Sequence, residues 1–371
     1  MQFTMNVQDL LDGLNTVTRA LSARPAKPIL EGVLIEASEN VITLTCSDGS
    51  LAIESMITAH VQETGRAVLP GRLFTELARK LPGGDVTIKV SDNYKATIQC
   101  MSSRSNLAGM NPVEYPEMPE VNEGTAVNIQ QNRLRDMISR VVFAIAVDET
   151  RQILTGCLLE VTSDEARLVA LDGYRLAMQK IFHPFQLPAE KPSLRAVIPG
   201  RVLNELTKIL PEEDTFCNLI FDKARMQATF GNTRLSTVLL AGEYIDYKKI
   251  LPASFKTTAR ANRSEVQNAI DRASLMAREG KNNLIRMSFR DDQLAITSNA
   301  ELGDVREEMD VNLQGDPIEI AFNAKYITDV IRNVTDSELC MKFNTNVSPC
   351  VFTPVEGDGF LYLILPVRVF Q

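Results

Sequence analysis

The 371-residue chain contains no tryptophan and only two histidines, His60 and His183, which leaves little material for histidine-based acid–base chemistry or metal binding. His183 stands between an aromatic residue and a proline, a context typical of a strand end rather than of a catalyst. None of the six cysteines forms a CxxC pair or lies at zinc-ligand spacing from a histidine. We therefore expect buried, reduced thiols and no metal site.

Other absences narrow the class of protein further. No apolar run approaches the ~18 residues that a membrane span requires. The first residues lack the basic start and apolar core of a signal peptide, so we expect a cytoplasmic protein. The chain has no P-loop, no GxGxxG after a strand and no GxSxG, and we therefore expect neither a cofactor nor enzymatic activity. A hydrolase built from dispersed carboxylates stays open, because such acid pairs come from distant positions.

One sequence unit occurs three times along the chain. Residues 70–82, PGRLFTELARKLP, recur 129 residues later as PGRVLNELTKILP at 199–211. A more diverged copy, NAKYITDVIRNV, lies 124 residues further on at 323–334. Both offsets are close to a third of the chain, the signature of a tandem repeat. With boundaries at the proline-rich stretch 112–119 and after Pro252, we predict domains at residues 1–122, 123–253 and 254–371.

Each copy predicts the same order of elements: a helix, strands, a hairpin, a second helix and further strands. Asp48-Gly49 and Asp172-Gly173 mark the hairpin, and Ile296–Asn299 fills that place in the third copy without a glycine. Apolar residues in a helical pattern mark the opening helices: Leu10, Leu11, Leu14 and Val17; Leu134, Ile138, Val141 and Val142; Val266, Ala269, Ile270 and Ala273. In the second helix, Leu73, Leu77 and Leu81 are expected to pack on the sheet. The fold class is α+β, with two helices on one side of largely antiparallel sheet.

The second helices share a charge pattern. Two cations stand seven residues apart with an acid between them: Arg72, Glu76 and Arg79; Arg201, Glu205 and Lys208; Lys325, Asp329 and Arg332. The windows around all six expected helices carry net positive charge, although the whole chain carries −8. A positive helical surface suits phosphates of any sequence, and an acidic remainder discourages adhesion elsewhere. From charge alone, duplex binding and a charge-patterned protein scaffold without a DNA role are about equally supported.

Several motifs in order resemble the bacterial DNA polymerase III beta subunit, the beta sliding clamp family: Arg24-Pro25, Asp172–Leu176, Tyr247–Pro252, Phe322–Tyr326 and Leu365–Arg368. The resemblance covers the whole chain. It implies a head-to-tail homodimer whose six domains close a ring around duplex DNA, loaded by a clamp loader and tethering the replicative polymerase without chemistry of its own. The DNA-facing candidates are Arg24, from the family's loop, and Arg72, Arg79, Arg201, Lys208, Lys325 and Arg332, chiefly from the repeat and charge arguments.

The resemblance also implies a cleft for short hydrophobic peptides of partner proteins. The corresponding residues are Leu154, Leu171, Gly173, Tyr174, Arg175, Leu176, Lys249, Ile250, Asn323, Tyr326, Val347, Leu363, Leu365, Pro366, Val367 and Arg368. Ile245 replaces a usual proline, Tyr174 often corresponds to histidine, and Phe370-Gln371 extends past the usual end. Independently, the apolar C-terminus predicts a buried strand over Leu361–Ile364, which the chain leaves at Pro366.

For the dimer interface, the resemblance indicates Leu107, Leu275 and Met276, with an ordinary core role as the alternative for the last two.

Overall fold

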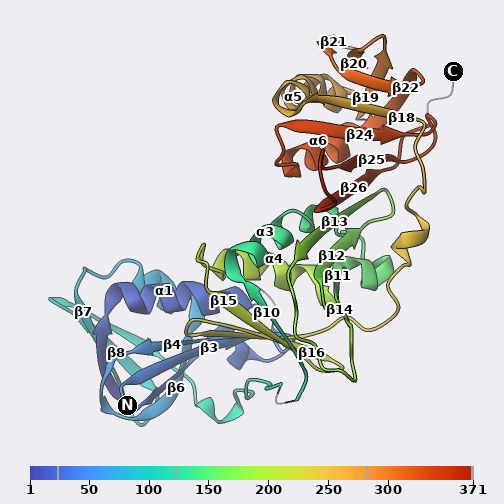
Figure 1. Ribbon diagram of the computed structural model, residues 1–371. Coiled ribbons are helices and arrows are strands. Elements are labelled where there is room, and N and C mark those ends of the chain that lie inside the picture. Colours follow the sequence, from blue (N-terminus) through green and yellow to red (C-terminus); the bar gives the residue numbers. More distant parts are fainter. Residues whose placement is uncertain (23–24, 122, 281–282, 369–371) are drawn as a thin grey trace. The chain divides into compact units, whose positions relative to one another are not determined.

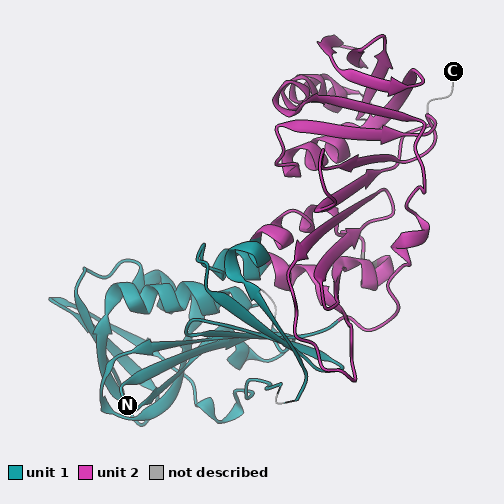
Figure 2. Cartoon of the chain, viewed as in Figure 1, with its two compact units in different colours: residues 1–135, 205–239 teal, residues 136–204, 240–371 magenta. Residues whose placement is uncertain are grey.

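The computed structural model describes all residues except 23–24, 122, 281–282 and 369–371, together with all side chains in helices and strands except that of residue 149. Figure 2 shows two compact units, residues 1–135 with 205–239 and residues 136–204 with 240–371. The central copy of the repeat therefore contributes to both units. Among the described residues, no helix combines the length and the apolar character needed to cross a membrane.

Unit 1 holds two antiparallel sheets (Figure 1). The five-stranded sheet has the order β5 (His60–Glu63), β1 (Gln2–Asn6), β7 (Asp85–Val90), β8 (Lys95–Cys100) and β9 (Ser103–Ala108). The eight-stranded sheet has the order β10 (Thr125–Gln130), β15 (Phe216–Phe221), β16 (Arg225–Phe230), β17 (Thr233–Val238), β4 (Leu51–Thr58), β3 (Val41–Ser47), β2 (Gly32–Ser38) and β6 (Gly65–Pro70). Its helices are α1 (Val7–Val17) and α2 (Gly71–Ala78), with short 3₁₀ turns η1 (Thr18–Ala20), η2 (Pro28–Glu31) and η3 (Pro112–Glu114).

Unit 2 also holds two antiparallel sheets. The nine-stranded sheet has the order β14 (Leu194–Pro199), β11 (Gly156–Val161), β12 (Glu165–Leu171), β13 (Arg175–Phe182), β26 (Phe360–Ile364), β25 (Cys350–Thr353), β24 (Glu338–Phe343), β18 (Thr257–Asn262) and β22 (Asn312–Gly315). The four-stranded sheet has the order β21 (Gly303–Asp310), β20 (Gln293–Ala300), β19 (Leu284–Arg290) and β23 (Ile318–Asn323). Its helical elements are α5 (Arg263–Glu279), α6 (Ala324–Asn333), η4 (Val142–Ala144), η5 (Glu149–Thr155) and η6 (Tyr247–Lys249). Helices α3 (Gln131–Ser139) and α4 (Gly200–Ile209) have residues in both units.

Successive copies of the repeat are joined by strand pairing. In unit 1, β17 of the second copy pairs with β4 of the first, with Thr237 opposite Leu51. In unit 2, β26 of the third copy pairs with β13 of the second, with Ile364 opposite Arg175. Each large sheet therefore runs without a break from one copy into the next. The α+β class and the antiparallel sheets predicted from the sequence are confirmed.

Two expectations about element order are wrong. Each copy opens with a strand, β1, β10 or β18, before its first helix, because a short alternating stretch precedes the helical pattern; Phe3 and Met5 alternate with more exposed residues in β1. In the third copy, residues 296–299 continue β20, and the turn follows at Glu301-Leu302. The Asp-Gly turns are confirmed: Gly173 has φ +92°, a conformation that glycine adopts without a steric cost.

The helices bury the face that lies against the sheets. Leu10, Leu14 and Val17 of α1 are fully buried, as the spacing predicts. The expectation for α2 is wrong at Leu73, whose side chain is 54% exposed, because the buried stripe runs instead through Phe74 and Ala78.

Candidate partner-peptide site

The floor of the candidate peptide site is a buried apolar cluster in unit 2. Leu154 of η5, Leu171 at the end of β12, Leu176 of β13 and Leu363 of β26 belong to one cluster. Ile245, at the place of the usual proline, packs against the same cluster. Two copies of the repeat contribute to this floor, because β13 pairs directly with β26.

Two tyrosines fix the floor to the sheet. The buried hydroxyl of Tyr244 lies 3.4 Å from the carbonyl oxygens of Gly156 and Val169, to which it donates. Burial raises the pKa of Tyr244 far above its ordinary value, so the hydroxyl stays a donor. Tyr247 donates to a carboxylate oxygen of Glu160 at 2.6 Å, and burial together with that carboxylate raises the pKa of Tyr247 to about 12.

The remaining candidates form an accessible rim. Exposed apolar side chains are Tyr174, Ile250, Val347 and Leu365, at 60%, 39%, 55% and 36% respectively. Gly173, Lys249 and Arg368 are exposed, while Asn323, Tyr326, Pro366 and Val367 are half-buried. After β26 the chain leaves the sheet as predicted and is held by two backbone bonds, from the Leu365 amide to Tyr174 and from the Val367 amide to Ala321, both 2.8 Å.

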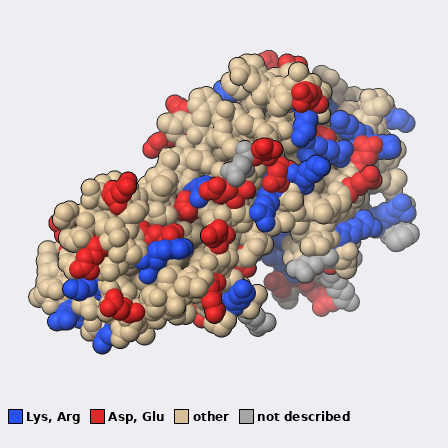
Figure 3. Space-filling view, turned by 90° about the horizontal axis from the view of Figure 1, so that it is seen from below, with Lys and Arg blue, Asp and Glu red and all other residues tan. Residues whose placement is uncertain are grey.

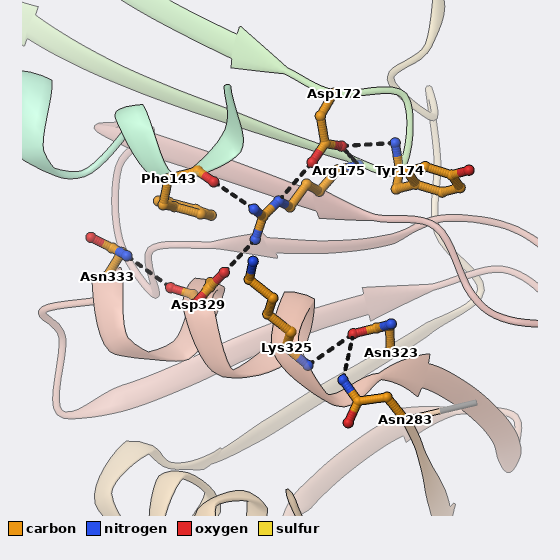
Figure 4. Close-up of polar contacts among 9 residues, drawn as sticks. All are labelled: Phe143, Asp172, Tyr174, Arg175, Asn283, Asn323, Lys325, Asp329 and Asn333. Carbon is orange, nitrogen blue, oxygen red and sulfur yellow. Dashed lines mark hydrogen bonds and ion pairs between the residues drawn. The ribbon is translucent and has the colours of Figure 1, made fainter. Parts of the chain in front are cut away.

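Arg175 is the most constrained side chain of the site (Figure 4). Its guanidinium donates from Nε to Asp172 at 3.0 Å, from Nη1 to Asp329 of α6 at 2.6 Å, and from Nη2 to the Phe143 carbonyl at 2.6 Å. The guanidinium carbon lies 5.3 Å from the Phe143 ring centroid and 4.7 Å from that of Tyr326. Only 6% of the side chain is exposed. Arg175 therefore fastens the β12–β13 turn to α6 rather than offering a free charge to a peptide.

The Arg175 contacts hold an aromatic wall on the rim. Tyr174 and Tyr326 stack with ring centroids 5.8 Å apart and an interplanar angle of 23°. Burial, followed by the Asp172 carboxylate, raises the pKa of Tyr326, so the Tyr326 ring stays neutral near neutral pH. An apolar floor beside exposed aliphatic and aromatic side chains suits a short hydrophobic peptide. Among the described residues, no group of three or more His, Cys, Asp or Glu side chains could hold a metal ion.

Family models of the DNA polymerase III beta subunit match almost the entire chain. The N-terminal domain model matches residues 1–119, the central domain model 128–246 and the C-terminal domain model 248–368. The chain belongs to the DNA polymerase III beta subunit family. Beta sliding clamps of Staphylococcus epidermidis and Staphylococcus aureus are 34% and 33% identical over 380 residues, which covers 100% of each chain.

Solved structures agree with the family. The DNA polymerase sliding clamp from Bacillus subtilis matches with a TM-score of 0.95 at 33% identity. The beta subunit from the DNA polymerase of Streptococcus pyogenes matches with a TM-score of 0.94 at 25% identity, and both matches cover 100% of each chain. The family consists of sliding clamps, processivity factors that catalyse no reaction.

The structure places the described DNA-facing candidates on exposed positions of the second helix of each copy: Arg72 and Arg79, the latter at the C-cap, on α2; Arg201 and Lys208 on α4; Lys325 and Arg332 on α6. Arg24 lies outside the described residues. Several of these cations have partners: Arg79 binds Asn15 at 2.9 Å, Lys208 binds Glu205 at 2.8 Å and Arg332 binds Asp271 at 2.9 Å. Figure 3 accordingly shows acidic groups interspersed among the Lys and Arg side chains on one face.

The interface candidates lie beside strands at the ends of the sheets. Leu107 is on β9, the last strand of its sheet, and is 8% exposed. Leu275 on α5 is 63% exposed, so the alternative of a core role is wrong for it, while Met276 is half-buried. Helix α5 packs against β21, the last strand of the four-stranded sheet.

Sequence reasoning missed the interior of the site. Phe143 and Tyr244 were absent from the candidates, although Tyr244 follows Tyr115 by the same 129 residues as the repeated helix. The two tyrosines make matching bonds, since Tyr115 donates to the carbonyls of Gly32 and Thr45. The repeat offset was the signal that could have found Tyr244.

Proposed function

We propose that two copies of this chain join head to tail into a closed ring that encircles duplex DNA and serves as the sliding clamp of a bacterial replicative polymerase. One observation carries the proposal. The copies are joined twice in the same way, β4 with β17 and β13 with β26. The strand corresponding to β17 in the first copy is β9, and the strand corresponding to β4 in the third copy is β21. Both are the last strands of their sheets, and each has one edge that no other described strand pairs with.

The free edges of β9 and β21 are complementary and belong to the first and third copies, so each could pair with the other edge in a second chain. Joining β9 of one chain to β21 of another continues the sheet as the internal junctions do, and a joint of that kind is heterologous, so it closes only as a ring. Each chain contains two internal joints between its three domains, and each chain would supply one further joint, between its end and the other chain. We propose Leu107, Leu275 and Met276 as part of that joint, and residues 1–122, 123–253 and 254–371 as the domains.

The exposed cations of the second helices are the proposed DNA-facing set, with Arg24 beside them. They contact phosphates without reading bases, because lysine and arginine bind the backbone charge of any sequence. A ring held by such contacts slides. Since it would work on bacterial chromosomal DNA, we also propose a cytoplasmic location.

The rim and floor in unit 2 are the proposed docking site for the polymerase, the clamp loader and other partners, which would insert short hydrophobic peptides. The exposed Tyr174, Ile250, Val347 and Leu365 supply apolar contact area, and the buried leucines supply a rigid base.

The topological proposal has a direct test. Protein loaded on nicked circular DNA with a clamp loader should leave the DNA when the circle is linearised, and light scattering should return about twice the 41.2 kDa chain mass. A scaffold without a DNA role would never join the circle, and a direct binder would stay on the cut DNA. Replacing Arg72, Arg201 and Lys325 together by Glu should lower retention while peptide binding stays intact. Pro366→Ala combined with Val367→Ala should weaken peptide binding while retention on DNA stays intact. Unaffected peptide binding in that variant would refute the site.

A further inference from the structure

Three leucines stand out among the exposed apolar side chains. Leu73 on α2 is 54% exposed, Leu275 on α5 is 63% exposed and Leu302 in the β20–β21 turn is 79% exposed. A single exposed leucine is ordinary on a protein surface, so the place of each leucine in the repeat decides whether it has a role. The repeat shows what occupies the same three positions elsewhere in the chain.

The positions correspond by their place in the elements. The third residue of the second helix is Leu73, Val202 or Tyr326 in the three copies. The residue just before the strand that follows the hairpin turn is Ser50, Tyr174 or Leu302. The residue twelve places after the start of the opening helix is Arg19, Phe143 or Leu275.

At the joint between the second and third copies, these positions hold the rings around Arg175. Tyr326 comes from the third copy, and Tyr174 and Phe143 come from the second. At the two ends of the chain, the same positions hold leucine: Leu73 at the β9 end, and Leu275 and Leu302 at the β21 end. The side chains that meet at an internal joint are thus the side chains left exposed at the ends.

Among the described residues, the two ends show no counterpart of the ion pair found at the internal joints. The acid at the sixth residue of the second helix, Glu205 or Asp329, receives an arginine of the preceding copy: Arg19 at 3.1 Å, or Arg175 at 2.6 Å. The corresponding acid of the first copy is Glu76, which is exposed. At the other end, Leu275 and Gly303 occupy the two places that supply arginine internally.

We infer that Leu73 of one chain packs against Leu275 and Leu302 of a second copy, so that an apolar contact takes the place of the arginine–aromatic cluster at the joint between chains. The inference rests on the proposed head-to-tail ring. It assigns Leu73 and Leu302, which neither the charge pattern nor the motifs indicated, to the surface that holds the two chains together. Burial of three exposed leucines favours association because it removes apolar surface from water.

A charge-swap cycle tests the pairing, with dimer dissociation followed by sedimentation equilibrium. Leu73→Lys and Leu302→Glu each place a charge in an apolar contact, which we expect to weaken each joint at least about tenfold. Because a closed head-to-tail dimer contains the joint twice, the dimer Kd should rise about 100-fold for each single variant. The double variant L73K/L302E should bind at least about tenfold more tightly than either single variant, since the two new charges attract.

The controls separate this pairing from the ring itself. Val113→Lys changes an apolar residue that is 82% exposed and lies on η3, and should leave the dimer Kd unchanged. Peptide binding should persist in every variant, which shows that unit 2 is folded. If the wild-type chain dimerises but L73K and L302E leave the dimer Kd unchanged, the pairing is wrong and the ring is not. The same holds if the losses of affinity in the two single variants simply add in the double variant. A wild-type chain that stays monomeric at micromolar concentration overturns the ring.

Cross-linking gives a second measurement. In L73C/L302C a short bismaleimide should join two chains, whereas L73C and L302C alone should give none of this product. The six native cysteines are all buried and offer little background. Failure of the double-cysteine dimer to cross-link, under conditions where light scattering shows it to be dimeric, would also overturn the pairing.

Discussion

Arg175→Met should loosen the junction between β13 and β26 without affecting the corresponding junction between β17 and β4. The substitution keeps an unbranched apolar stem but removes the guanidinium that joins Asp172, Asp329 and the Phe143 carbonyl. Asp172 and Asp329 would then remain near an apolar floor without their cation.

The magnitude follows from the burial of the partners. Removing one member of a buried ion pair costs about 3–5 kcal/mol, because the other member is left buried and unpaired. The Asp329 side chain is 26% exposed and regains some water. Asp172 keeps the bonds from the backbone amides of Tyr174 and Arg175 at 2.9 and 3.0 Å. We therefore expect the lower end, about 3 kcal/mol, which corresponds to roughly 100-fold in a local opening equilibrium.

Hydrogen exchange resolves this effect by strand. Amides of β13 and β26 should exchange about 100-fold faster in R175M, while those of β4 and β17 serve as the internal control. Arg175→Lys should give an intermediate loss, because lysine keeps the charge but not the three-way geometry. Adding Asp329→Asn to R175M should cost less than the sum of the single changes, since it removes the unpaired charge. A change below about threefold in β13 and β26 would refute the account of Arg175 as the fastener of this joint.

Three further predictions follow from buried groups. Burial raises the pKa of the Cys46 thiol, and the other five cysteines are also buried, so a thiol reagent at pH 8 should label the chain only after unfolding; a rapidly labelled native thiol would contradict this. Tyr244→Phe should lower stability by about 1 kcal/mol in urea titrations, with peptide binding as the check on the floor, because it removes the buried hydrogen bonds that the Tyr244 hydroxyl donates. Burial raises the pKa of Glu205, but bonds from Lys208 and Arg19 outweigh it and hold the pKa below the ordinary value of 4.5. The stability that Glu205 adds should therefore be present above that value and vanish as the pH falls through the lowered pKa, and Glu205→Gln should lose this part of the pH dependence.

Much of the fold could be predicted from the sequence because it is periodic at two scales. The offset of 129 residues reveals the repeat, and helical spacing within each copy locates α1 and α5. The opening strands were missed because each is only five or six residues long and runs directly into a stronger helical pattern. The sequence places Leu73 on the buried face of α2 because Leu73 and Leu77 have the same spacing of four as Phe74 and Ala78, which are the buried residues. The two pairs differ by one residue, and one residue turns the helix face by about 100°.

The site could be predicted only in part. The motif Asp172–Leu176 marks a turn, but the partner that decides the role of Arg175 is Asp329, 154 residues away. No local pattern links two residues at such a distance, and only strand pairing between copies brings them together. The resemblance indicated Arg175 as a peptide residue, whereas its contacts make it a positioning residue for Tyr174 and Tyr326.

One helical acid shows how a repeat becomes three different joints. Glu205 binds Arg19, which takes the place of Phe143 twelve residues after the start of the opening helix, and Asp329 binds Arg175, the first residue of β13, instead. Both internal joints therefore hold an arginine against the acid, reached from different positions. In the part of the chain that the structure describes, Glu76 pairs with no arginine, and the two places that supply arginine at the internal joints hold Leu275 and Gly303 in the third copy. In the pairing inferred above, the joint between chains, which a clamp loader would open, relies on apolar contact instead of an arginine–acid pair, while the joints within one chain keep theirs.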